Sequence, residues 1–182
     1  MLEWNAQLYS RFEDERTRPA SDLLARVQLP YEATYVVDLG CGPGNSTELL
    51  TQRFAHAQVL GIDNSQDMLT AARERLANIR FEWADIGNWQ AEKINGRLPD
   101  VIFANAALQW VPNHAVLLPR LLGMLAPGGV LAIQMPDNRG ESTHRLMREL
   151  ASEMPWNAEI GDPNALRTDL LTLNEYYDLL AK

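Results

Sequence analysis

Short apolar runs alternate with helical segments along most of this 182-residue chain. Five runs rich in valine, isoleucine and other apolar residues predict buried strands at 35–39, 58–62, 79–83, 100–104 and 130–135. Apolar residues at helical spacing predict helices at 46–54, 65–76, 114–125, 141–154 and 173–180, and an N-terminal helix over 4–27 that is interrupted near Pro19. Because strands separated by helices pair in parallel, the alternation predicts an α/β fold, a Rossmann-like three-layer sandwich with a mostly parallel, doubly wound sheet.

The composition of the chain argues against some classes of binding partner. The formal net charge of −8 argues against a nucleic-acid partner, which usually requires a basic surface. The single cysteine, Cys41, allows no internal disulfide. The charged N-terminal segment has no apolar core of a signal peptide, and no apolar run approaches the roughly 20 residues of a membrane-spanning helix. We therefore expect a cytoplasmic protein without a membrane partner.

A glycine-rich turn follows the first predicted strand, with the sequence DLGCGPGNS over residues 38–46. Asn45 stands where the dinucleotide fingerprint has its third glycine, and no lysine follows that would make a phosphate-binding loop. Asp38, just before the glycines, would repel a diphosphate and attract a positively charged ligand such as a sulfonium. The alternative is a tight strand-to-helix turn that binds nothing.

Two more acids end the next two predicted strands. Asp63 lies about 20 residues beyond the glycine turn, the distance at which an acid reaches ribose hydroxyls. Asp85 follows the third strand, where it can accept a hydrogen bond from an exocyclic amine of adenine, with Ile86 against the ring. The alternatives are an Asx-type cap at Asp63 and a plain surface turn at Asp85.

These segments together resemble the class I methyltransferase superfamily. VVDLGCGPGNS, GIDNS, WADI, ANAALQWV and LAPGGVLAI match its successive motifs over residues 36–135. The resemblance implies S-adenosyl-L-methionine as cofactor and no metal. The cofactor-binding residues expected on this basis are Asp38, Gly40, Cys41, Gly42, Asn45, Asp63, Asn64, Met68, Asp85, Ile86 and Asn105.

Three further segments, MLEWNAQLYSRFEDERTRPASDLL, NAALQWVPNH and QMPDN, resemble the trans-aconitate methyltransferase family. That resemblance implies methyl transfer to one carboxylate of trans-aconitate, giving a monomethyl ester, and places Tyr9, Arg11 and Trp110 near the substrate. A polycarboxylate also needs cationic partners, so Arg139 and Arg145 are added as substrate candidates. No acid–base catalyst is expected, because a carboxylate is already ionised at neutral pH. We expect His114 to serve at a helix start or on the surface.

We expect one methyltransferase domain over residues 1–182: a helical N-terminal lid over 1–30, a cofactor-binding core over 31–136 and a helical, incomplete C-terminal part over 137–182. A small carboxylic acid is the expected partner, and a monomer the expected state. Other small-molecule or acyl carrier-linked carboxylates, a nitrogen nucleophile and a truncated non-catalytic S-adenosylmethionine-binding protein stay open as alternatives. A nicotinamide-dependent oxidoreductase is disfavoured by the missing third glycine.

Overall fold

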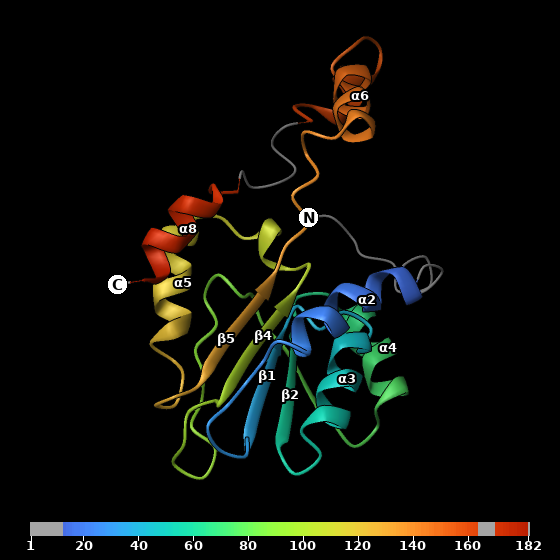
Figure 1. Cartoon of the computed structure of the whole chain (residues 1–182). Coiled ribbons are helices and arrows are strands. Elements are labelled where there is room, and N and C mark those ends of the chain that lie inside the picture. The colour runs from blue at the N-terminus through green and yellow to red at the C-terminus, as the bar shows by residue number, and fades with distance from the viewer. Residues whose placement is uncertain (1–12, 164–169, 182) are drawn as a thin grey trace.

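The computed structural model describes residues 13–163 and 170–181. In this part of the chain five strands form one parallel sheet in the order β3-β2-β1-β4-β5 (Figure 1). The strands are β1 (Tyr35–Leu39), β2 (Gln58–Asp63), β3 (Arg80–Trp83), β4 (Val101–Asn105) and β5 (Val130–Gln134). The predicted fold class is confirmed.

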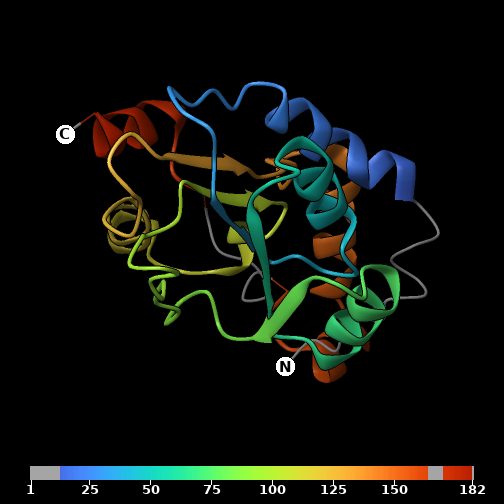
Figure 2. The same cartoon turned by 90° about the horizontal axis from the view of Figure 1, so that it is seen from below.

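Helices cover both faces of the sheet (Figure 2). Val36 of β1 packs in a core cluster with Leu24 and Leu50, whereas its neighbour Val37 packs in a second cluster with Leu118. This follows from the twofold alternation of side chains along a strand. One face carries α2 (Glu13–Leu24), α3 (Asn45–Arg53) and α4 (Gln66–Arg75), and the other carries α5 (His114–Leu122) and α8 (Leu173–Leu180).

The strand order reverses between β1 and β4. From β1 the chain builds outward through β2 to β3, then returns to the other side of β1 for β4 and β5. In open α/β sheets, ligands bind beyond the carboxyl ends of the strands at such a reversal. The short 3-10 helix η2 (Leu108–Trp110) follows β4 at this end of the sheet.

Two predicted helices differ from the structure. The interruption expected at Pro19 is wrong, because α2 continues through it, with Ala20 and Leu24 buried beside the sheet; the predicted start at Trp4 lies outside the described residues. The helix expected over 141–154 divides into α6 (Ser142–Ala151) and α7 (Trp156–Ile160). The proline at position 155 explains the division, since the residue before a proline disfavours the helical conformation. The other boundaries either match the prediction, as in β1 and α8, or shift by one to three residues.

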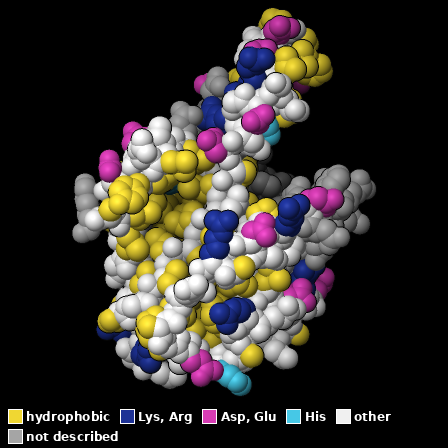
Figure 3. Space-filling view, in the orientation of Figure 1, with side chains coloured by type: hydrophobic (Ala, Val, Ile, Leu, Met, Phe, Trp, Pro, Cys, Tyr) yellow, Lys and Arg dark blue, Asp and Glu magenta, His cyan; other side chains and the backbone are white. Residues whose placement is uncertain are grey.

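The α6–α7 segment projects beyond the carboxyl end of β5 (Figure 1), and neither helix has a buried residue. Hydrophobic side chains gather at its tip (Figure 3). The exposed large hydrophobic residues of the two helices include Leu146, Met147, Leu150 and Trp156. In the described residues no helix is both long and apolar enough to cross a membrane.

Candidate functional site

A cavity of about 580 Å³ opens where β1, β2, β3 and β4 end, which is within the size range of small-molecule sites. We call it the strand-end cavity. The segments that form its wall are the glycine turn, the residues that follow β2, β3 and β4, and one side of α5. The lining residues are Gly40, Gly42, Asp63, Asn64, Met68, Asp85, Ile86, Gly87, Asn88, Asn105, Ala106, Ala107, Trp110, Val111, Pro112, Asn113, Val116, Leu117 and Arg120.

The glycine turn brings bare backbone to the cavity. Gly42 has φ +53°, and a Cβ added there would meet nothing within 4 Å, so its main chain is open to a ligand. Gly40 is required for a different reason. Its φ is +71°, and an added Cβ would come within 2.3 Å of the Cβ of Ala107. The turn therefore packs tightly against the segment after β4 on one side and is open on the other.

Asp63 joins two loops with one carboxylate. Its Oδ2 accepts a hydrogen bond from the Gly42 N–H at 2.9 Å, and its Oδ1 accepts one from the Ser65 N–H at 2.9 Å. Burial raises the pKa of Asp63, and the hydrogen bonds from backbone N–H groups oppose that rise. Each carboxylate oxygen has a second lone pair. Asp63 therefore forms an Asx-type turn, but the N-cap of α4 is Ser65, whose Oγ accepts from the Met68 N–H. The Asp63 carboxylate still has acceptor capacity.

The turn after β3, residues 85–89, forms the next part of the wall. Oδ1 of Asp85 accepts a hydrogen bond from the Gly87 N–H at 2.8 Å, while the Asp85 carbonyl accepts from the N–H of Trp89 at 2.8 Å. Ile86 is buried beside it. From α5, the guanidinium of Arg120 reaches this turn and donates to three of its carbonyl oxygens.

Asp38 lies behind the glycine turn. It is completely buried, and its Oδ2 accepts hydrogen bonds from Ser46 Oγ at 2.7 Å and Thr47 Oγ1 at 2.6 Å. Its other oxygen, Oδ1, has no hydrogen-bond partner among the residues that the structure describes. Burial raises the pKa of Asp38 to about 6, although the two hydroxyl hydrogen bonds lower it and the Asp63 charge adds to the rise. Because Asp38 does not line the cavity, it can attract a cationic ligand only across the glycine turn, without touching it.

The far wall is built from the segment between β4 and α5. Trp110 is 40% exposed at the rim of the cavity. His114 is the first residue of α5 and is buried, with Nε2 2.8 Å from the Leu108 carbonyl oxygen and Nδ1 2.5 Å from the Tyr176 hydroxyl. A carbonyl only accepts, so Nε2 carries the proton. The helix-start interpretation of His114 is confirmed, but its ring is buried, not on the surface.

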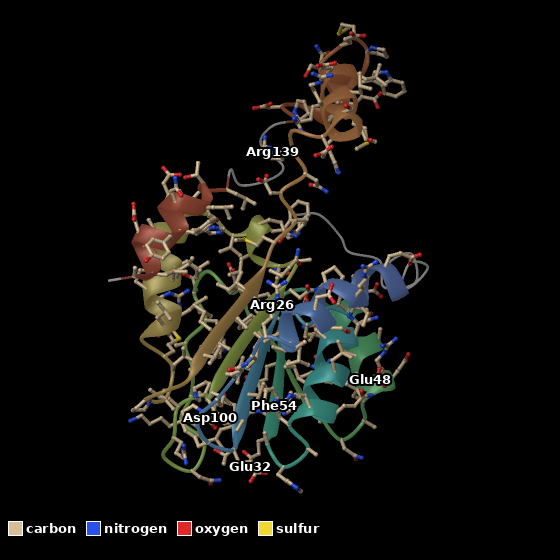
Figure 4. The ribbon with its side chains drawn as sticks, in the orientation of Figure 1. Arg26, Glu32, Glu48, Phe54, Asp100 and Arg139 are labelled. Carbon is tan, nitrogen blue, oxygen red and sulfur yellow. The ribbon has the colours of Figure 1, made fainter. Side chains whose placement is uncertain are left out.

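The predicted substrate residues are distributed differently. Arg139 lies beyond the carboxyl end of β5, on the segment that leads to α6 (Figure 4), and its carbonyl accepts from Arg148. Arg145 lies on α6 and pairs with Glu149 at 3.6 Å. Neither arginine is on the wall of the strand-end cavity. Tyr9 and Arg11 lie outside the described residues.

Known proteins are similar to this chain in sequence and in fold. A protein family described as methyltransferase domain matches residues 31–180. Trans-aconitate 2-methyltransferase of Variovorax paradoxus (strain S110) is 65% identical over 181 residues, which cover 100% of this chain and 68% of that protein. The chain belongs to the S-adenosylmethionine-dependent methyltransferase family. It spans about two thirds of that relative's length.

Solved structures agree with this membership. An S-adenosylmethionine-dependent methyltransferase from Mesorhizobium loti is 28% identical with a TM-score of 0.52, over 65% of this chain and 52% of that one. Phosphoethanolamine N-methyltransferase 2 of Haemonchus contortus, solved with S-adenosyl-L-methionine, shares the fold with a TM-score of 0.65 at 20% identity, over 90% of this chain and 36% of that one. S-adenosylmethionine is the cofactor of this family.

The strand-end cavity fits that cofactor. Two carboxylates, those of Asp63 and Asp85, stand on the wall against a single guanidinium, so the charge favours a cationic ligand. Polar groups for a ligand are available at two places. The backbone is open at Gly42, and among the described residues the buried Oδ1 of Asn105 has no hydrogen-bond partner. Met68 and Ile86 add apolar surface. A polar and apolar wall of this kind suits a charged, partly aromatic molecule.

Most of the predicted cofactor residues come together on this wall. Those on it are Gly40, Gly42, Asp63, Asn64, Met68, Asp85, Ile86 and Asn105, and their contact with the cofactor stays a prediction. Three lie off it: Asp38 behind the turn, Cys41, whose buried side chain packs with Phe81, and Asn45, whose Nδ2 donates to Thr17. The sequence prediction missed Arg120, which no motif marks because only the packing of α5 brings it here.

Proposed function

We propose that this chain transfers a methyl group from S-adenosylmethionine to a carboxylate oxygen of a small polycarboxylic acid, with trans-aconitate as the leading candidate. The product is a monomethyl ester. The observation that carries the proposal is 65% identity along the whole chain to a protein named trans-aconitate 2-methyltransferase. The acidic strand-end cavity supports it, because its charge suits a sulfonium cofactor.

Each acid on the wall has a proposed role. Asp63 accepts hydrogen bonds from the ribose hydroxyls with its remaining lone pairs, while its bonds to Gly42 and Ser65 keep both loops in place. Asp85 accepts one from the exocyclic amine of adenine, and Ile86 packs against the ring. The open main chain at Gly42 leaves room for the methionine end. When bound, S-adenosylmethionine supplies an electrophilic methyl group on its sulfonium.

The protein's part in the reaction is alignment. A carboxylate is ionised at neutral pH, so methyl transfer to it requires no general base. His114 fits this view, since both of its ring nitrogens are already engaged with Leu108 and Tyr176. Trp110 and Val116 at the cavity wall exclude water from the reacting oxygen.

Cations for the acid come from outside the described wall. Arg120 is the one basic side chain among the lining residues, and its N–H groups are directed at backbone carbonyls. We therefore assign cofactor binding to the core over 31–136. We assign the substrate side to the N-terminal part over 1–30, with Arg11, and to the C-terminal part over 137–182, with Arg139 and Arg145.

The test is methyl transfer from S-[methyl-³H]adenosylmethionine to trans-aconitate, cis-aconitate, citrate and a primary amine, with the product examined for a base-labile ester. We expect labelled ester from trans-aconitate. Replacing Arg11 with Ala raises KM for the acid by about tenfold or more and leaves KM for the cofactor unchanged, because it removes a charged pair to the substrate. Arg11→Lys recovers part of the loss, since an ammonium cannot reproduce the bidentate fork.

Arg53→Ala is the matched control, because Arg53 is an exposed arginine at the end of α3 that is not on the cavity wall and lies outside the part assigned to the substrate. It leaves both KM values unchanged. Labelling of the amine with no acid accepted would refute the acceptor assignment. Binding of S-adenosylhomocysteine without transfer to any acceptor would indicate the non-catalytic binding protein instead.

A further inference from the structure

Arg120 makes three hydrogen bonds to one short turn. Its Nη2 donates to the carbonyl oxygens of Ile86 at 2.8 Å and Gly87 at 2.9 Å, and its Nη1 donates to the carbonyl oxygen of Trp89. The turn lies 31 to 34 residues away along the chain and follows β3, whereas Arg120 lies in the last turn of α5. One guanidinium thus holds a turn of a different layer of the fold.

The turn has little other regular structure to fix it. Between β3 and β4 the structure describes no helix or strand, only an isolated bridge between Ile94 and Arg97. Ile86 and Trp89 are buried and set the depth of the turn, but apolar contacts do not fix the direction of a carbonyl group. Hydrogen bonds to a guanidinium do, because its five N–H groups form a rigid planar fork.

Carbonyl direction matters because the same turn forms the cavity wall. Asp85, Ile86, Gly87 and Asn88 all line the strand-end cavity, and so does Arg120. With its carbonyls directed to Arg120, the turn keeps the N–H of Gly87 on the Asp85 carboxylate at 2.8 Å. Both kinds of backbone polar group in this turn are therefore bound by a charged side chain. The Arg120 cation binds carbonyl oxygens, and the Asp85 carboxylate binds the Gly87 N–H.

We propose that Arg120 is a positioning residue for the cofactor, which holds the turn at residues 85–89 so that Asp85 and Ile86 receive the adenine ring. The inference rests on the proposed assignment of this turn to adenine. It predicts that loss of Arg120 harms recognition of the base more than binding of the rest of the cofactor. A purely structural role would instead lower stability and affinity without changing which base is preferred.

The test compares the affinities of S-adenosylhomocysteine and S-inosylhomocysteine by calorimetry on the full chain. The inosine ligand has an oxo group in place of the amine that Asp85 is assigned to recognise, and a proton on the neighbouring ring nitrogen N1. The unaltered protein binds the adenine ligand more tightly. In Arg120→Met the dissociation constant for S-adenosylhomocysteine rises by about tenfold or more, and the preference over the inosine ligand falls toward one. Arg120→Lys gives an intermediate preference, because an ammonium reaches fewer of the three carbonyls.

Arg73→Met is the matched control. Arg73 also donates from a helix to a backbone carbonyl, that of Phe81 in β3, at 3.0 Å, but it is not on the cavity wall. It keeps both the affinity and the base preference. If Arg120→Met does not fold, the preference of Arg120→Lys decides the question.

An unchanged preference in every folded Arg120 variant overturns the proposal, and so does an equal loss for the two ligands. Absence of any preference for the adenine ligand in the unaltered protein overturns it as well, because Asp85 then does not distinguish the two bases. The proposed methyl acceptor is judged separately, by turnover of the unaltered protein on trans-aconitate. Each proposal can therefore fail without the other.

Discussion

Replacing Gly40 with Ala tests the close contact that shapes the glycine turn. The added Cβ would lie 2.3 Å from the Cβ of Ala107, whereas carbon atoms in contact prefer about 3.5–4.0 Å. Crowding of a packed site by one methyl group costs about 1–3 kcal/mol. The left-handed backbone, with φ +71°, adds about 1–2 kcal/mol for an L-residue. We therefore expect Gly40→Ala to lower the free energy of unfolding by about 2–5 kcal/mol.

A second substitution separates the two causes. Ala107→Gly removes the atom at 2.3 Å, after which the nearest atoms to the new Cβ are the Cα of position 107 and the Cδ1 of Ile86, both at 3.6 Å. In the double variant only the backbone strain of about 1–2 kcal/mol and the loss of a small buried methyl group remain. Urea denaturation of the four proteins gives a double-mutant cycle, whose coupling energy we expect to be about 1–3 kcal/mol in the rescuing direction.

Gly42→Ala is the matched control. Its φ of +53° imposes the same kind of strain, but its Cβ meets no atom within 4 Å. It costs about 1–2 kcal/mol of stability, and its methyl group projects into the strand-end cavity, so it weakens binding of S-adenosylhomocysteine. Equal stability losses in the Gly40 and Gly42 variants, or no rescue by Ala107→Gly, would refute the packing argument.

Two further predictions concern pH. Burial raises the pKa of Asp38 to about 6, above its unfolded value of 3.8, so the folded protein without cofactor gains stability as pH falls through that window. Asp38→Asn should raise the free energy of unfolding by up to about 3 kcal/mol near pH 7 and by little near pH 4, and an equal gain at both pH values in urea denaturation would contradict this. For Asp100, burial raises the pKa, but hydrogen bonds from Thr34 and Tyr35 outweigh it and lower the pKa below its usual value. Asp100→Ala should therefore cost about 3 kcal/mol near neutral pH, through unsatisfied buried donors, with the deficit shrinking as acid protonates the original carboxyl; a deficit independent of pH would exclude the carboxylate as its cause.

The sequence predicted the fold because short, largely apolar runs, which form the strands, alternate with segments of helical spacing. The residues 35–39 illustrate this, since all five are buried in β1. The same run did not show which face each side chain takes. Alternation requires Asp38 and Leu39 to face opposite sides, but only the packing of α3 shows that Asp38 lies under Ser46 and Thr47. Helix ends were less predictable, because Pro19 is tolerated where tertiary packing buries Ala20 and Leu24.

The predicted site residues were those marked by position at a strand end. Asp63 is the last residue of β2, and Asp85 lies two residues beyond the end of β3, so their positions at strand ends indicated them. Arg120 has no such mark, because its partners are carbonyl oxygens, and every residue carries a carbonyl. A contact of this kind depends on how α5 is placed on the sheet. It therefore appears only when the layers are assembled.

The carboxylates of this site bind the backbone of the loops, and they are the same groups that we assign to the cofactor. Asp63 holds the N–H groups of Gly42 and Ser65, and Asp85 holds that of Gly87, so each loop is organised by a group assigned to the cofactor. Removing either carboxylate would break the hydrogen bonds that hold its loop as well as the contact proposed for the ligand. An amide keeps one acceptor oxygen, so Asp63→Asn separates the two effects better than Asp63→Ala. A site built this way couples loop order to cofactor affinity, and changes in either are expected to appear in both.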